Sequence, residues 1–134
     1  MGVIQGGKVI EGALARPVQE VSFEIGREAS NVVNVAIEMR VGGQAVTERA
    51  RGEFYLSDDA NGDSLTATAP SGGLAVGTNG VILSEHTSGK HFTAISEADG
   101  SIDINIRHAG ARTWRLIAVM NDGRITPSAA IRFA

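Results

Sequence analysis

Apolar and polar residues alternate along residues 31–41. The apolar positions are Val33, Val35, Ile37, Met39 and Val41, and the polar positions are Asn34, Glu38 and Arg40. A period of two is the spacing at which side chains of an extended chain share a face. The run therefore predicts a β-strand with one buried face and one solvated face.

Similar alternating runs recur as far as the C-terminus and are separated by turn residues such as Gly42-Gly43 and Asn121-Asp122-Gly123. Strands are expected over residues 18–25, 31–41, 51–57, 65–69, 81–83, 90–97, 102–107, 112–120 and 131–133. No segment has the three-and-four apolar spacing of an amphipathic helix. Short strands at this regular spacing predict an all-β, antiparallel β-sandwich, immunoglobulin-like or a small jelly roll.

The segment 112–120 differs from the other strands because both of its faces contain apolar residues. Trp114, Leu116, Ala118 and Met120 share one face, and Ile117 and Val119 lie with Arg115 on the other. This strand is expected to be covered on both sides.

Residues 1–17 form a separate N-terminal arm, and residues 18–134 form the sandwich domain. Four glycines and Pro17 interrupt two apolar pairs in the arm, Val3-Ile4 and Val9-Ile10. The segment is either a frayed terminus or an extended arm that adds to the sheet of a neighbour. The pairing of the apolar residues favours a docked arm, with Val3, Ile4, Val9 and Ile10 as candidate contacts.

The composition is that of a single domain with its own core. The chain has 134 residues, of which 43% are hydrophobic and 4% aromatic, and no cysteine. Such a core is built from aliphatic side chains without disulfides, which favours folding in a reducing cytoplasm. No apolar run approaches the roughly 20 residues of a membrane helix, and the N-terminus lacks a signal-peptide pattern. No membrane partner is expected.

Charge is distributed unevenly although the net charge is only −3, too small to argue for a nucleic-acid partner. Residues 58–103 contain seven acidic groups and one Lys, whereas residues 104–134 contain five Arg and one Asp. Cross-strand charge pairing is one interpretation, and complementary patches for assembly are the other. Arg112 and Arg115 are candidate contacts, although solvated strand faces explain them equally well.

Candidate catalytic or metal-binding groups are few. The spacing of His86, His91 and His108 matches no metal-ligand motif, so each is interpreted as a surface histidine without a local partner. The run 58–63 (Asp-Asp-Ala-Asn-Gly-Asp) suggests calcium, but its flanks are strands and no distant Glu follows, which favours a turn. No Gly-x-Ser-x-Gly nucleophile motif is present. The sequence predicts no enzyme, no cofactor and no metal.

Four segments carry a resemblance to a known class of proteins. They are residues 54–64 (FYLSDDANGDS), 67–73 (ATAPSGG), 96–100 (SEADG) and 130–134 (AIRFA). They are similar to small proteins encoded among the head genes of tailed bacteriophages, of the capsid decoration or cement type. Residues 31–37 resemble the opening of immunoglobulin-like modules in such proteins. The resemblance covers about residues 31–134.

The resemblance implies a β-sandwich that binds the outside of a capsid lattice at many symmetry-related places, with the major capsid protein as partner. It implies no catalytic residues, a location on the virion, and assembly in the cytoplasm of the bacterial host. A dimer or trimer on the shell is plausible from open sheet edges and a detachable arm.

Two other functions remain open. One is an immunoglobulin-like module of a phage tail or fibre that binds a host receptor or glycan, and the other is a bacterial surface adhesion module. Exposed loop aromatics would favour the first, but Tyr55 and Trp114 both lie inside predicted strands. The absence of a signal peptide and of repeated modules counts against the second.

Overall fold

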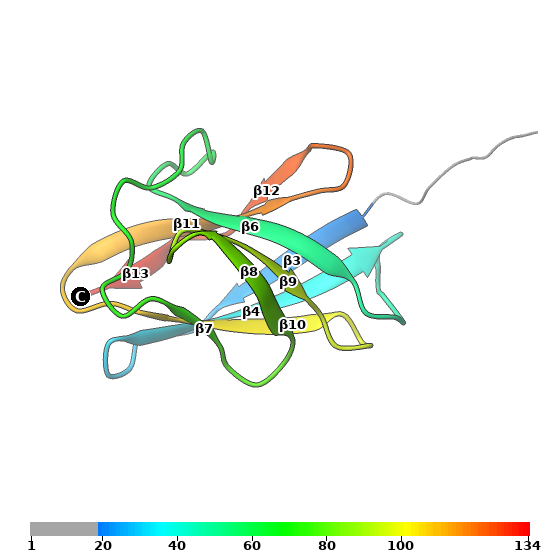
Figure 1. The fold of residues 1–134 in the computed structure, drawn as a ribbon, viewed down its shortest axis with the longest axis horizontal. Helices are drawn as coiled ribbons and strands as arrows, with labels where there is room; N and C mark the ends of the chain where they lie inside the picture. The colour runs from blue at the N-terminus through cyan, green and yellow to red at the C-terminus, as the bar shows by residue number, and fades with distance from the viewer. Residues whose placement is uncertain (1–18) are drawn as a thin grey trace, which may run out of the picture.

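The computed structural model describes residues 19–134, which form strands, turns and loops only. The strands, labelled from β3 as in Figure 1, are β3 (Gln19–Ile25), β4 (Val32–Val41), β5 (Gln44–Ala45), β6 (Arg51–Ser57), β7 (Leu74–Val76), β8 (Val81–Thr87), β9 (His91–Ile95), β10 (Ser101–Arg107), β11 (Arg112–Val119), β12 (Ile125–Pro127) and β13 (Ile131–Phe133). The all-β prediction is confirmed. Within this range no helix is long and apolar enough to cross a membrane.

The strands form two antiparallel sheets. The five-stranded sheet has the order β3-β4-β10-β7, with β5 pairing to the end of β4. The six-stranded sheet has the order β12-β11-β6-β9-β8, with β13 also pairing to β11. These orders match the A-B-E-D and G-F-C arrangement of immunoglobulin domains, with the hairpin β8–β9 added beside β6. Of the two predicted architectures, the strand order is that of the immunoglobulin type.

The core lies between the sheets and is built from the predicted alternating faces. In β4, Val33, Val35, Ile37 and Met39 are at most 2% exposed, and their neighbours on β10 are Ile102, Ile104 and Ile106. The six-stranded sheet contributes Phe54 and Phe92, whose rings stack at a centroid distance of 5.4 Å.

Strand β11 is covered on both faces, as its sequence predicts. Trp114, Leu116 and Ala118 point into the core, and Ile117 on the opposite face is also fully buried. The loop 58–69 covers Ile117 at Gly62, where an added Cβ would lie 3.1 Å from the Ile117 Cδ1. Gly62 also has a φ of +75°, so the covering loop requires glycine at this point.

The strand expected over residues 65–69 is wrong, because this segment is part of the covering loop. Leu65 is 43% exposed, and Thr66 is buried in its place. Thr66 is buried because its hydroxyl accepts a hydrogen bond from the buried Trp114 indole at 3.1 Å.

The strand expected at 81–83 is confirmed as the first part of β8. Val81 and Leu83 are 48% and 51% exposed, and Ile82 packs on the core. Strand β8 lies at the edge of its sheet, and two register shifts interrupt its alternation after Ile82. The short strand β7 was not expected, because three residues are too few to show a period.

Candidate functional site

The candidate site is the outer face of the six-stranded sheet, meaning the face turned away from the five-stranded sheet. Strand register aligns its side chains in rows across the sheet. The central row is Ile125, Val119, Glu53, Thr93 and Ser84. The rows on either side are Pro127, Ile117, Tyr55, His91 and Thr87, and Arg51, Ile95 and Val81.

Large exposed apolar side chains gather on this half of the molecule. In the described part of the chain they are Leu65, Val81, Leu83 and Ile125, with 40–51% of each exposed. All four belong to the six-stranded sheet or to the loop that covers it, and none belongs to the five-stranded sheet. Contiguous apolar surface marks interaction sites, whereas single exposed apolar residues are normal; these four side chains are therefore candidate contacts, and Val81 and Ile125 lie on opposite edges of the sheet.

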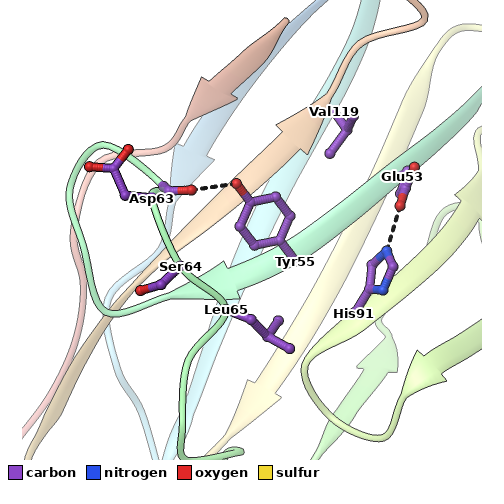
Figure 2. A pocket seen from close by; sticks show the side chains of 8 residues that line it. Glu53, Tyr55, Asp63, Ser64, Leu65, His91 and Val119 are labelled. Atoms are coloured by element: carbon purple, nitrogen blue, oxygen red, sulfur yellow. Dashed lines mark hydrogen bonds and ion pairs between the residues drawn. The ribbon is translucent and has the colours of Figure 1, made fainter. Parts of the chain in front are cut away.

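A shallow depression of about 320 Å³ lies within this face. Its lining comes from β6, β9, β11 and the covering loop, and consists of Glu53, Tyr55, Gly62, Asp63, Ser64, Leu65, His91 and Val119. Figure 2 shows the Tyr55 ring beside the loop that carries Asp63, Ser64 and Leu65, with its hydroxyl directed toward that loop. The hydroxyl donates to the Gly62 carbonyl at 2.6 Å.

Two carboxylates, Glu53 and Asp63, line the depression together with the Tyr55 phenol and the His91 ring. Burial raises the pKa of Tyr55, and the negative charge of Asp63 raises it further. The phenol therefore stays protonated at neutral pH and keeps its hydrogen bond to the loop. A positively charged or apolar group fits this surface better than an anion.

Two histidines meet next to the depression. The His91 ring points toward the Glu53 carboxylate in Figure 2. Its Nε2 lies 2.5 Å from Glu53 Oε2, and its ring centroid lies 4.7 Å from that of His86. His86 Nε2 is hydrogen-bonded to Thr93 Oγ1 at 2.7 Å. The partners of both histidines lie on neighbouring strands and not nearby in the sequence, so the local pattern does not reveal them.

The third histidine, His108, is also engaged. Its Nδ1 accepts a hydrogen bond from the Ser71 amide at 3.0 Å, and its ring lies edge-on to Trp114 at 4.9 Å. It joins two loops at one end of the sandwich and lies away from the depression.

A second depression, of about 300 Å³, adjoins the first. It is lined by Gln19, Arg51, Gly52, Glu53, Thr93, Val119, Met120 and Asn121. Glu53 and Val119 line both depressions. The two depressions therefore lie on either side of these two side chains.

The predicted contact residues are placed as follows. Arg112 donates from Nη2 to Asp58 Oδ1 at 2.7 Å, and its guanidinium lies 5.3 Å from the centroid of the Trp114 ring. This pair joins the acidic and basic segments, as the cross-strand interpretation expects, and holds the covering loop against β11. Arg115 is half-buried opposite Ser57. Val3, Ile4, Val9 and Ile10 lie outside the described residues, so their contacts stay predictions.

The acidic run 58–63 is organised as a turn. The Asp59 amide donates to Ser57 Oγ at 3.0 Å, and the Asn61 amide donates to Asp59 Oδ1 at 2.8 Å. In residues 19–134 no three His, Cys, Asp or Glu side chains are grouped so that they could hold a metal ion.

Sequence reasoning missed Glu53, Tyr55 and His91, which line the first depression. Glu53 and Tyr55 alternate with Phe54 and Leu56, so the pattern indicates that they share the outer face. That they lie beside His91 depends on the pairing of β6 with β9, which no local pattern encodes.

No protein-family model matches this chain, and no curated protein matches it.

Proposed function

We propose that this chain is a structural protein of a bacteriophage head, a decoration or cement protein that binds the outside of the capsid lattice and stabilises it. The observation that supports this most is the one-sided distribution of exposed apolar side chains on the six-stranded sheet and its covering loop. The resemblance of residues 54–64 and 96–100 to head-gene proteins supplies the class of partner, the major capsid protein.

The proposed mechanism is stabilisation of the assembled lattice by binding to it. A protein that binds the assembled lattice and not the free subunit stabilises the lattice by mass action. Each copy contributes a modest contact through Leu65, Val81, Leu83 and Ile125, and repetition over the shell multiplies the effect.

The test uses purified capsids that lack the protein. The double variant Val81→Asp/Leu83→Asp places two charges on the docking face at half-exposed positions, so the fold is expected to survive. The matched control is Ala75→Asp, at an exposed position of β7 in the five-stranded sheet.

We expect at least a tenfold loss of occupancy on capsids for the double variant and wild-type occupancy for the control. Capsids saturated with wild-type protein should also release DNA at a higher temperature than bare capsids. Wild-type protein that fails to bind, or a double variant that binds as well as the control, contradicts the proposal.

One observation favours the tail or fibre module that binds a host glycan. Tyr55 lines an exposed depression with Glu53, Asp63 and His91, and a ring beside polar groups suits a sugar. Trp114, in contrast, is fully buried. Glycan-array binding that is lost in Tyr55→Ala and retained in Val81→Asp/Leu83→Asp would favour this second function.

A further inference from the structure

The sheet edges in the part of the chain that the structure describes are formed by β3, β7, β8 and the pair β12 and β13. An open edge exposes unpaired backbone N–H and C=O groups, which proteins protect with short strands, bulges or proline. Strands β7, β12 and β13 have three residues each, β12 ends at Pro127, and β8 contains two register shifts. Strand β3 has seven residues that pair with β4 in an unbroken register, so its free edge has none of these protections.

The hydrogen bonds of β3 show which of its backbone groups face the free edge. The Gly26 amide donates to the Asn34 carbonyl at 2.8 Å, and this pair continues the register of β3 and β4. Hydrogen-bonded and non-hydrogen-bonded pairs alternate along an antiparallel ladder. The even-numbered residues of β3 therefore bind β4, and the backbone N–H and C=O groups that point away from β4 are those of Val21, Phe23 and Ile25.

The solvent-facing side chains of this edge are acidic. Glu20 and Glu24 are exposed, Ser22 lies between them, and β3 contains no basic residue. No ion pair within residues 19–134 involves either glutamate. The Glu20 carboxylate accepts a hydrogen bond from the Gly43 amide at 2.9 Å. A strand with Lys or Arg opposite these positions would form cross-strand ion pairs, whereas a second copy of β3 would add further acidic side chains.

The inward-facing side chains of β3 lie at the margin of the core. Val21 is buried, whereas Phe23 and Ile25 are only partly buried although they pack against the core. An added strand would place every second side chain beside these residues, because side chains alternate between the two faces of a sheet. Apolar side chains at those positions would complete the burial of Phe23 and Ile25, which is favourable.

We propose that the free edge of β3 binds an extended segment of a partner protein in which apolar residues alternate with Lys or Arg. The backbone groups of Val21, Phe23 and Ile25 form the hydrogen bonds, as in recognition by strand addition. Glu20 and Glu24 select the basic residues, and the apolar residues extend the core. This site is separate from the outer face of the six-stranded sheet, so its test needs no capsid and is independent of the proposed function.

Amide hydrogen exchange, followed by NMR, tests whether the edge is open. In the free protein the amides of Ser22 and Glu24 are bonded to β4, whereas those of Val21, Phe23 and Ile25 face the free edge. The second group should therefore exchange about tenfold faster than the first at low protein concentration.

A blocked hexapeptide, Val-Lys-Val-Thr-Val-Lys, is the probe for the partner segment, and Val-Glu-Val-Thr-Val-Glu is its matched control. Paired antiparallel to β3, the probe places its lysines opposite Glu24 and Glu20 and its second valine opposite Phe23. It should slow the exchange of the edge amides and bind about tenfold more tightly than the control, because opposite charges across strands attract and like charges repel. N-methylation of the second valine should abolish binding, since this nitrogen donates to β3, whereas N-methylation of the threonine should not.

A charge variant tests the selection of basic residues. Glu24→Lys leaves one acid and one base on the edge, so it should remove the preference for the lysine peptide. The matched control is Glu48→Lys, at an exposed position in the loop between β5 and β6. It changes the net charge equally and should keep the tenfold preference.

Four results would overturn the proposal. Edge amides that are protected in the free protein at every concentration would show that the chain covers its own edge. Protection that is lost on dilution would identify a second copy as the occupant. Failure of the lysine peptide to bind, or a preference for it that persists in Glu24→Lys, would show that the edge does not select a basic segment.

Discussion

Replacing Thr66 by Val removes one hydroxyl at the point where the covering loop is attached to β11. Thr66 is 1% exposed, and its hydroxyl oxygen accepts from the Trp114 indole at 3.1 Å and from the Thr68 amide at 3.2 Å. The same hydroxyl lies 3.0 Å from Asp58 Oδ1, to which it donates. Valine keeps the shape of the side chain and loses all of these hydrogen bonds.

Most of the expected loss of stability comes from Trp114. Its indole N–H is buried, so water cannot replace the Thr66 hydroxyl as the hydrogen-bond acceptor. A buried donor that loses its acceptor costs about 1–3 kcal/mol. The Thr68 amide and Asp58 lie at the surface, where water replaces the lost bonds at little cost. We expect Thr66→Val to lower the free energy of unfolding by about 2 kcal/mol, which corresponds to roughly 6–10 °C in Tm for a domain of this size.

Urea unfolding followed by Trp114 fluorescence measures this change. The midpoint should fall while the m-value stays constant, because the surface exposed on unfolding is nearly unchanged. Thr66→Ser keeps the hydroxyl and should lose less, and Thr68→Val at an exposed position should stay within about 0.5 kcal/mol of wild type. If Thr66→Val is as stable as Thr68→Val, the hydroxyl does not anchor the loop and the reasoning is wrong.

Three further predictions concern Gly62 in the covering loop, the ionisation of Asp103 on the five-stranded sheet, and the N-terminal residues 1–17. Gly62→Ala should destabilise the fold by about 1–2 kcal/mol, because alanine strains the left-handed backbone and its Cβ presses on Ile117; a thermal melt that matches wild type would contradict this. Burial opposes ionisation of Asp103, but hydrogen bonds from the Asn79 amide, Asn34 and the Thr78 amide outweigh it and lower the pKa below 3.8. The stabilisation that the ionised Asp103 contributes is therefore complete above that pH and is lost as the pH falls through the lower pKa of Asp103 in the folded state. In a plot of unfolding free energy against pH, Asp103→Asn should reduce the loss of stability at acid pH, whereas Glu24→Gln should not. Deleting residues 1–17 should reduce occupancy on capsids and leave the sandwich folded by circular dichroism; unchanged occupancy would remove the arm from the docking surface.

The sequence predicts strands well where one face is buried and the other is solvated. The runs 31–41 and 102–107 correspond to β4 and β10 within one residue at each end, because every second residue enters the core. The expectation fails at Leu65 and Thr66. Burying the Thr66 hydroxyl with its hydrogen-bond partner stabilises the fold more than burying the Leu65 side chain would. The partner that makes the difference, Trp114, lies 48 residues away, and local alternation contains no information about it.

The depression lined by Glu53 and His91 is less predictable than the fold for the same reason. Glu53 and His91 are 38 residues apart and meet only because β6 and β9 pair in one particular register. His86 reaches His91 through a register shift between Glu85 and Thr87 in an edge strand. The polar positions are visible in the sequence as the solvent side of a strand, but their neighbours across the sheet are not.

The two outer faces differ in how much binding capacity they retain. On the five-stranded sheet, polar side chains bind one another: the Asn34 amide donates to Asp103 at 2.9 Å and to Asn105 at 2.8 Å. On the six-stranded sheet the four exposed apolar side chains are about half buried already, so completing their burial yields about 1 kcal/mol each, or about 4 kcal/mol in total. Association alone costs at least about 4 kcal/mol, so this face by itself holds a single partner weakly. Under the proposed function, stable attachment would require contacts to several subunits or a second element such as the arm, and this requirement is what would let the protein discriminate an assembled lattice from a free subunit.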